Sequence, residues 1–385
     1  MPWEVTTTVI ERERFVRAHA SGRYTVSELA IHFGVSRKTA HKWLKRYDQL
    51  GLIGLEDRSH AAHTHPNATP AEVEAALIAM KRDKPTWGPL KLDGKDLPAE
   101  VQALWPAPST RGAILSRAGL TRHRRLRKRV PPYTQPFARC DAPNTLWCID
   151  FKGWFRTRDG SRCDPLTITD AYSRMILCCQ AMPRTDAAHT QAAMERVIRE
   201  YGLPQTIRSD NGSPFASTAA AALTRLSVWW LKLGIHHERI RPGHPEQNGR
   251  HERMHLTLQQ ECCQPPAANL VLQQQRFDAF RHSFNHQRPH QALGQQPPAS
   301  LYQPSLRPYP AHLEDPVYTA DAAVRRVRTN GEIRWRGKLI FLSEALIGEA
   351  VAVSETPTGY EVHFGPVQLG LLDAKGERLV RPLAT

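Results

Sequence analysis

The stretch Trp147-Cys148-Ile149-Asp150-Phe151 sets an aspartate near the end of an apolar, strand-like run. A second such run leads into Arg208-Ser209-Asp210-Asn211-Gly212, and a polar, helix-forming segment with two glutamates follows at residues 244–255. An apolar run excludes a charged side chain unless something compensates the charge. Carboxylates brought together from such elements are the ligands with which proteins hold a pair of hard divalent cations. The three segments therefore predict a metal site on an α/β core.

The composition predicts several packed domains and a polyanionic partner. The chain has 385 residues, 41% of them hydrophobic, and nine tryptophans, which is typical of two to four domains. The net charge of +15 is uneven: residues 1–140 hold 24 Lys and Arg against 13 Asp and Glu, whereas residues 303–385 hold 10 against 10. The basic front half favours a nucleic acid as partner, with a merely solvated basic surface as the alternative.

The cysteines and the hydropathy pattern indicate a cytoplasmic protein. Four of the seven cysteines are adjacent in the sequence, as Cys178-Cys179 and Cys262-Cys263, and no Cys-x-x-Cys spacing occurs. This pattern favours reduced thiols over a disulfide scaffold or a zinc ribbon. No run of about 18 apolar residues occurs, so no membrane partner is expected.

The N-terminal residues 1–58 predict a helix-turn-helix DNA-binding domain. Residues 7–21 favour a helix, and Thr25 with Glu28 forms a capping box for a second helix that ends before Gly34. Ser36 can cap a third helix over residues 37–49. Cations crowd this last helix, which is the one expected in the major groove, so DNA binding is favoured over a generic helical hairpin. The candidate DNA contacts are Arg37, Lys38, His41, Lys42 and Lys45.

Residues 69–130 predict a second, smaller helix-turn-helix domain. One helix is expected after Thr69, with Pro70 in its first position, and another is expected from Ser109 to Ala118. A run without any acidic residue follows, and such a run neutralises phosphates without reading a base sequence. Its candidate DNA contacts are Arg122, Arg124, Arg125, Arg127, Lys128 and Arg129.

The rest of the chain predicts an α/β core and a small all-β domain. Strands are expected over residues 145–155, 165–169, 174–181 and 205–209, with a helix over 186–201 and helical segments from Asp210 to about Ser283. This core spans residues 144–302, and a proline-rich linker follows at 303–320. Alternating apolar and polar residues over 321–385 predict about five short strands forming a small β-barrel.

The motifs around the carboxylates resemble a known family. Asp150, Ser209-Asp210-Asn211-Gly212 and the segment from Pro245 to Glu252 are similar to the DDE catalytic core of retroviral integrases and insertion-sequence transposases, above all to the insertion sequence 481 group of bacteria. Four further stretches carry the resemblance, which runs nearly the full length of the chain: residues 146–153, 170–174, 241–245 and 284–293.

The resemblance implies a fold, a cofactor and a set of catalytic residues. The implied fold is multidomain α/β, with N-terminal helix-turn-helix domains, an RNase H-like integrase catalytic core and the small C-terminal β-barrel. The implied cofactor is Mg²⁺, two ions, with Mn²⁺ as a substitute. The implied catalytic residues and metal ligands are Asp150, Asp210 and Glu252.

Two glutamates compete for the third position. Glu246 is separated from Asp210 by 35 intervening residues, the better-known spacing, against 41 for Glu252, but Glu246 follows Pro245 in a turn where its backbone is poorly fixed. Glu252 lies within a helix predicted to start near Gln247, and the family places its glutamate three residues after the glycine that matches Gly249. We therefore favour Glu252 and keep Glu246 as the alternative.

The resemblance implies a transposase that binds terminal inverted repeats, nicks the element ends and transfers the 3′-hydroxyl ends into target DNA. Its partner would be double-stranded DNA, both inverted-repeat ends and target. Joining two ends implies a homodimer or higher multimer, associated with the bacterial nucleoid. A DNA-binding regulator with a relic core and a metal-dependent nuclease without strand transfer are the two rivals.

Several other polar residues have plainer interpretations beside a functional one. His251 and His255 lie one turn apart and could hold a metal, although contact with DNA phosphate or a structural role is favoured. Asp170 is expected to pair with Arg174 or to cap a turn, and Arg288 is a candidate contact to the DNA backbone. Asn248 is a candidate for positioning the site.

Overall fold

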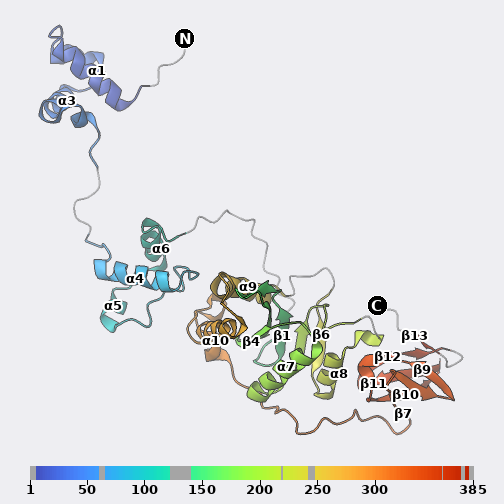
Figure 1. Ribbon diagram of the computed structural model, residues 1–385. Helices are drawn as coiled ribbons and strands as arrows, with labels where there is room; N and C mark the ends of the chain where they lie inside the picture. The colour runs from blue at the N-terminus through green and yellow to red at the C-terminus, as the bar shows by residue number, and fades with distance from the viewer. Residues whose placement is uncertain are drawn as a thin grey trace. The chain divides into compact units, whose positions relative to one another are not determined.

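The computed structural model describes residues 6–59, 66–121, 140–217, 220–241, 248–357, 359–373 and 378–380 (Figure 1). The chain divides into two compact units, Met1–Thr69 and Pro70–Thr385. Within the described residues, no helix is both long and apolar enough to span a bilayer. The run of six cations predicted to contact DNA, Arg122 to Arg129, lies outside the described residues.

The first unit is a three-helix domain whose helix starts follow the predicted caps. Its helices are α1 (Thr8–Ala20), α2 (Val26–His32) and α3 (Arg37–Leu50), followed by the 3₁₀ turn η1 (Gly51–Leu55). The capping box forms: the Glu28 carboxylate accepts from Thr25 N–H at 2.7 Å, and Thr25 Oγ1 accepts from Glu28 N–H at 3.3 Å. The helices α2 and α3, joined by a short turn, have the arrangement predicted for a helix-turn-helix. Its core is built by Phe15, Leu29, Ala40, Trp43 and Leu55.

The second unit begins with three short helices around a small apolar core. They are α4 (Ala71–Asp83), α5 (Ala99–Ala103) and α6 (Pro108–Arg117). The helix starts differ from the predicted ones by one or two residues. The residue that precedes α4 is Pro70 instead of Thr69, and the residue that precedes α6 is Ala107 instead of Ser109. The core of this segment consists of Leu77, Trp87, Leu92, Ile114 and Leu115.

A mixed sheet forms the centre of the second unit. The strand β1 pairs antiparallel with β3 and parallel with β5. The strand β4 extends the antiparallel side and β6 extends the parallel side. The strands are β1 (Leu146–Phe151), β2 (Phe155–Arg156), β3 (Arg162–Asp170), β4 (Ile176–Met182), β5 (Thr206–Ser209) and β6 (His236–Arg239). The sheet thus carries β1, with Asp150, between two hydrogen-bonded neighbours.

Helices cover both faces of this sheet (Figure 1). The helices α7 (Ala187–Tyr201) and α8 (Arg225–Lys232) pack on one face through Met194, Ile198 and Trp230. On the other face lie α9 (Gly249–Leu258), the π-helical turn η5 (Gln259–Cys263) and α10 (Leu270–His286), which bury Met254, Leu258 and Phe277 against Ile176 and Cys179. A register shift in the pairing of β3 with β4, between Ile168 and Thr169, interrupts the alternation, so that Ile176 and Cys179 face the same side of the sheet. The short 3₁₀ turns of the second unit are η3 (Ala220–Ala222), η6 (Gln291–Leu293), η7 (Pro298–Leu301) and η8 (Glu344–Leu346).

One part of the core was predicted wrongly. The sequence between Asp210 and Ser283 predicted helices only, whereas His236–Arg239 forms the edge strand β6, parallel to β5. Its sequence, His-His-Glu-Arg, has no apolar alternation that could indicate a strand. Pairing with β5 through the backbone, rather than burial of side chains, places it in the sheet.

The turn between β3 and β4 depends on a buried aspartate. Asp170 is fully buried, and its Oδ2 accepts from the backbone N–H of Ser173 and from the Ser173 hydroxyl, each at 2.7 Å. Its Oδ1 accepts from Asn144 N–H at 2.8 Å. Of the two roles predicted for Asp170, capping a turn is therefore the observed one.

The C-terminal segment forms open sheets. Five strands are ordered β13-β12-β11-β10-β7, and β8 pairs only with β9. Among the described strands, β13 and β7 are the two edges of the larger sheet and do not pair with each other, so closure into a barrel stays a prediction. The strands are β7 (Ala323–Arg326), β8 (Glu332–Trp335), β9 (Lys338–Phe341), β10 (Ala350–Thr356), β11 (Gly359–Phe364), β12 (Val367–Leu372) and β13 (Leu379–Val380).

Candidate active site

Asp150 lies near the end of β1, the strand whose position the sheet fixes most firmly. In the antiparallel register Asp150 is opposite Thr167 of β3. Its side chain is 17% exposed, and its Oδ2 accepts a hydrogen bond from Asn248 Nδ2 at 2.9 Å. Asn248, which is itself buried, directly precedes α9 and so ties the start of that helix to β1.

Asp210 follows the last residue of β5, the parallel neighbour of β1. Because the carboxyl ends of parallel strands meet at one edge of a sheet, Asp150 and Asp210 lie at the same edge. The Asp210 Oδ1 atom is buried and has no hydrogen-bond partner among the described residues. A Cβ on Gly212 would come within 3.0 Å of Asp210 Oδ2, so the glycine leaves room for the carboxylate.

The third carboxylate, Glu252, is exposed in the first turn of α9. The observed start of this helix at Gly249 agrees with the predicted start near Gln247 within the usual uncertainty of helix ends. The alternative, Glu246, lies outside the described residues. The structure therefore puts Glu252 on a rigid element, which was the argument for choosing it.

The negative charges of the other two carboxylates act on Asp150. The pKa of Asp150 is raised to about 7, first by burial and then by the negative charge of Asp210, with a smaller contribution from Glu252. The hydrogen bond from Asn248 opposes this shift. Burial also raises the pKa of Asp210, against the hydrogen bond from the Gly212 N–H. Like charges held this close are stable only with protons or cations among them.

This pKa shift predicts how stability depends on pH in the metal-free protein. Folding raises the pKa of the Asp150 carboxyl from 3.8 to about 7, so the unfolded chain releases the proton at a lower pH than the folded protein does. The free energy of unfolding therefore decreases as the pH rises from about 4 to about 7 and is constant outside this range. In a chelator, the unfolding free energy of the wild type should therefore fall relative to that of Asp150→Asn by about 1.4 kcal/mol per pH unit between about pH 5 and 6.5. Urea unfolding at a series of pH values measures this difference.

Asp159 provides the control. It is exposed, and the hydroxyl of Thr157 lowers its pKa. Its contribution is complete above pH 4, so the difference between wild type and Asp159→Asn should stay flat over the same range. A flat difference for Asp150→Asn as well would show that Asp150 ionises normally.

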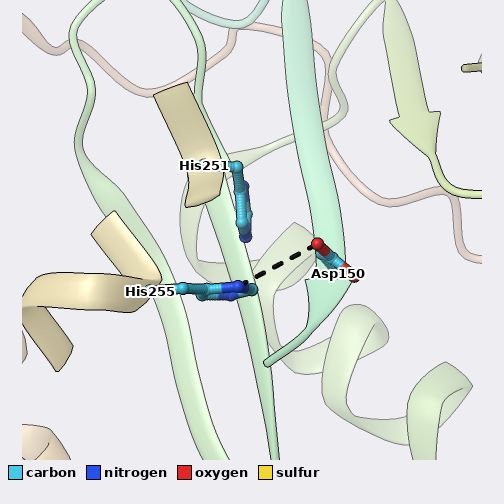
Figure 2. Close-up of side chains that lie close together, drawn as sticks. All are labelled: Asp150, His251 and His255. Atoms are coloured by element: carbon cyan, nitrogen blue, oxygen red, sulfur yellow. Dashed lines mark ion pairs between the residues drawn. The ribbon is translucent and has the colours of Figure 1, made fainter. Parts of the chain in front are cut away.

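Two histidines of α9 point into the sheet beside Asp150 (Figure 2). His251 is buried, with Nε2 2.6 Å from Thr167 Oγ1 and Nδ1 3.0 Å from Thr169 Oγ1. His255 places Nε2 2.7 Å from the same Thr167 hydroxyl and Nδ1 4.0 Å from Asp150 Oδ2. Burial lowers the pKa of His255 to about 4 and that of His251 well below its usual value, so both rings are neutral. His251 therefore has the structural role favoured from the sequence.

The predicted DNA contacts differ in how they are presented. On α3 all five are exposed, whereas Ala40 and Trp43 are buried in the domain core, and the Lys42 ammonium group lies 4.5 Å from the centre of the Trp43 ring. Arg288, in contrast, is only 7% exposed, and its Nη1 pairs with Glu261 at 2.6 Å. In this conformation Arg288 ties the end of α10 to η5. The five exposed contacts are Arg37, Lys38, His41, Lys42 and Lys45.

The sequence interpretation overlooked Thr167. Its hydroxyl contacts the Asp150 carbonyl and both histidines, although it lies 17 residues from Asp150 and 84 from His251. The only signal that could have found it is the strand register, and a single sequence does not specify that register. Ser209 was also missed as a partner of His237, whose Nε2 lies 2.8 Å from the Ser209 hydroxyl beside Asp210.

Comparison with known families identifies the parts of the chain. Residues 141–245 and 233–298 each match an integrase core domain, residues 11–63 match a helix-turn-helix domain, and residues 39–115 match a homeodomain-like domain. The strands that lead to Asp150 and Asp210 thus lie in a region that is similar to an integrase core domain, and the regions before it are similar to helix-turn-helix and homeodomain-like domains. Membership of the insertion sequence 481 group stays a prediction.

Two relatives by sequence come from insertion elements. The chain is 29% identical over 186 residues to an uncharacterized 31.7 kDa protein of insertion element IS407 from Burkholderia multivorans, covering 48% of this chain and 65% of the relative. It is 28% identical over 181 residues to an uncharacterized 39.2 kDa protein of IS476 from Xanthomonas euvesicatoria, covering 47% and 50%. The chain thus spans between half and two thirds of these relatives. The HTLV-2 integrase catalytic core in complex with magnesium matches at 14% identity and a TM-score of 0.34, over 42% of this chain and 99% of that one.

Proposed function

We propose that the protein is a DDE transposase that binds the terminal inverted repeats of its element, nicks the element ends and transfers the 3′-hydroxyl ends into target DNA. One observation carries the proposal: Asp150 and Asp210 lie at the same ends of two paired parallel strands, and the helix that carries Glu252 directly follows Asn248, which donates to Asp150 Oδ2. Neighbouring carboxylates at the edge of an integrase-like sheet repel one another, and divalent cations bound by them would remove this repulsion.

The residues of this site fit divalent cations. The buried Asp210 Oδ1 has no partner among the described residues, and oxygen ligands of this kind suit Mg²⁺. Asp150, Asp210 and Glu252 would hold two Mg²⁺ ions, with Mn²⁺ as a substitute. When bound, such a pair activates the attacking oxygen and stabilises the leaving oxygen. Asn248 would keep Asp150 oriented through its hydrogen bond to Oδ2.

The proposed chemistry has two balanced steps. Water first attacks the phosphorus at the element end, so that a new P–O bond forms, the P–O3′ bond breaks and the element keeps a free 3′-hydroxyl. This hydroxyl then attacks a phosphodiester of the target, losing its proton as the 3′ oxygen of the target leaves. No covalent bond between protein and DNA is needed. Because two ends must be joined, the active species would be a homodimer or a higher multimer on double-stranded DNA.

The domain organisation is part of the proposal. Helix-turn-helix domains at 1–58 and 69–130 would bind the inverted repeats, and the core at 144–302 would carry the chemistry. The strands of 321–385 would close into a small β-barrel. The protein would act on the bacterial nucleoid.

Removing the exposed lysines of α3 should weaken DNA binding without regard to base sequence. Lys38, Lys42 and Lys45 are exposed on that helix. Changing all three to alanine should lower the affinity for a random duplex by about 10²-fold and reduce the slope of log K against log salt by about 3, because about three counterions are no longer released. Fluorescence anisotropy over a salt series measures both. Arg17→Ala on α1, which breaks only the pair with Glu13, should change neither.

A strand-transfer assay tests the proposed function directly. The substrate is a duplex taken from the DNA that flanks the reading frame, pre-cut to expose the 3′-hydroxyl, and the target is a supercoiled plasmid. We expect joined products with Mg²⁺, and none from an end that carries a 3′-deoxy nucleotide. Nicking of uncut ends without joining would indicate a nuclease. Binding of the duplex without any cleavage or joining would indicate a regulator with a relic core.

A further inference from the structure

The Thr167 hydroxyl determines the tautomers of both histidines beside Asp150. Its Oγ1 contacts three groups: the Asp150 carbonyl at 3.1 Å, His251 Nε2 at 2.6 Å and His255 Nε2 at 2.7 Å. A hydroxyl has one proton and two lone pairs. A carbonyl can only accept, so Thr167 donates its proton to the Asp150 carbonyl. Both imidazoles must then donate to Thr167, and each neutral ring carries its proton on Nε2.

This assignment leaves the two Nδ1 atoms as acceptors with different surroundings. His251 Nδ1 accepts from the Thr169 hydroxyl at 3.0 Å, so both nitrogens of His251 are engaged. His255 Nδ1 receives no hydrogen bond from any described residue, and the group that it faces is Asp150 Oδ2 at 4.0 Å. A nitrogen lone pair and a carboxylate oxygen repel each other. A distance of 4.0 Å is also too long for a hydrogen bond between them.

One cation could still bind both atoms, which lie on the same side of the sheet (Figure 2). Nitrogen and oxygen ligands each lie about 2.0–2.2 Å from a transition ion, so two ligands on opposite sides of one ion are about 4.0–4.4 Å apart. The separation of 4.0 Å between His255 Nδ1 and Asp150 Oδ2 therefore fits opposite ligands of an octahedral ion such as Mn²⁺, and it is too long for neighbouring ligands of a tetrahedral ion. Asp150, His251 and His255 also form the cluster of potential metal ligands in the described part of the chain. Since the threonines use both nitrogens of His251, the nitrogen that remains for an ion is Nδ1 of His255.

We infer that His255 Nδ1 is an additional ligand of the ion held by Asp150, so that this position binds Mn²⁺ more tightly than the carboxylates alone would, while Mg²⁺ is held by the carboxylates. The inference rests on the proposed metal role of Asp150. Magnesium takes oxygen ligands almost exclusively, whereas transition ions accept imidazole as well. A mixed nitrogen and oxygen site therefore shifts selectivity away from Mg²⁺.

Pulsed electron paramagnetic resonance of Mn²⁺ bound to the full chain tests the inference without measuring activity. The wild type should show ¹⁴N modulation from a coordinated imidazole, and labelling the histidines with ¹⁵N should replace it by the ¹⁵N pattern. This isotope arm needs no substitution, so it does not depend on a variant that folds. The His255→Ala variant should lose the modulation and bind Mn²⁺ about tenfold more weakly, while its Mg²⁺ affinity changes by less than about threefold. Calorimetry gives both affinities.

His189→Ala is the matched control. His189 Nδ1 lies 2.8 Å from Asp186 on the exposed start of α7, so this pair is an alternative place for adventitious Mn²⁺. The control should keep the nitrogen modulation. Modulation lost in His189→Ala, or kept in His255→Ala, overturns the inference.

The proposed function can fail separately. If Asp150→Asn abolishes Mn²⁺ binding but the wild type shows no nitrogen coupling, the inference is wrong and the metal role of Asp150 stands. If Asp150→Asn leaves Mn²⁺ binding unchanged, both are wrong.

Discussion

Asp150→Asn should abolish end nicking and strand transfer while leaving the affinity for DNA unchanged. Asp150 is held by the pairing of its strand with Thr167 of β3 and by the hydrogen bond from Asn248, so the amide should occupy the same position as the carboxylate. The amide lacks the negative charge that a divalent cation requires. Losing several kcal/mol of transition-state stabilisation corresponds to a rate decrease of about 10³-fold or more. Single-turnover assays on pre-cut and uncut ends measure this loss for each step.

The same exchange at Asp159 is the control for Asp150→Asn. Asp159 lies in the exposed turn before β3, where it accepts from Ser161 N–H at 3.0 Å. Asp159→Asn should keep nearly full activity. If Asp150→Asn retained more than about a tenth of the wild-type rate with normal folding, the ligand role of Asp150 would have to be abandoned.

Glu252→Gln should be as damaging as Asp150→Asn, whereas Glu246→Gln should be nearly neutral. Glu252 is carried by a helix whose start is tied to Asp150 through Asn248 and whose inner face is buried through Met254 and Leu258. A rigid helix can hold a carboxylate to the accuracy that phosphoryl transfer needs. We expect about 10³-fold loss for Glu252→Gln and less than about threefold for Glu246→Gln in the strand-transfer assay.

The two glutamine variants control each other, because they make the same chemical change six residues apart. Activity that survives in Glu252→Gln and vanishes in Glu246→Gln would reverse the choice of the third carboxylate. If both glutamates were metal ligands, both variants would bind Mn²⁺ more weakly than the wild type. Calorimetry measures these Mn²⁺ affinities in the absence of DNA. A single weakened variant, Glu252→Gln, is the expected result.

Local signals explain why the helical parts of the fold could be predicted. The capping box at Thr25 and Glu28 and the cap at Ser36 are read from residues three apart, and each forms as expected. The strands β1, β3 and β4 could be predicted from their apolar residues, and β5, which reads Thr-Ile-Arg-Ser, from its position directly before the Ser-Asp-Asn-Gly motif. The strand β6 could not, because its four polar residues join the sheet only through backbone pairing with β5. Whether the C-terminal strands close into a barrel depends on pairings between distant segments, which a sequence pattern does not reveal.

The site divides in the same way. Asp150 and Asp210 were predictable because each interrupts or ends an apolar run, and Glu252 because of its place on a helix. Thr167 and the orientation of the histidines were not, since they depend on the register that sets Thr167 opposite Asp150. Arg288 shows the opposite error: its motif indicates a cation for DNA, yet in the fold its charge is paired with Glu261. A sequence reveals which side chains could act, whereas packing decides which of them are accessible.

The single proton of the Thr167 hydroxyl also constrains how this protein can evolve. Serine would preserve the arrangement, but valine, although nearly the same shape, would leave two imidazole N–H groups buried without an acceptor. A change of either histidine to an apolar residue would in turn release the threonine from its role. Positions 167, 251 and 255 should therefore vary together among related chains. A histidine at position 251 should rarely occur without a threonine or a serine at position 167. The same hydroxyl thus links the mutational histories of a strand and a helix that lie more than eighty residues apart in the sequence.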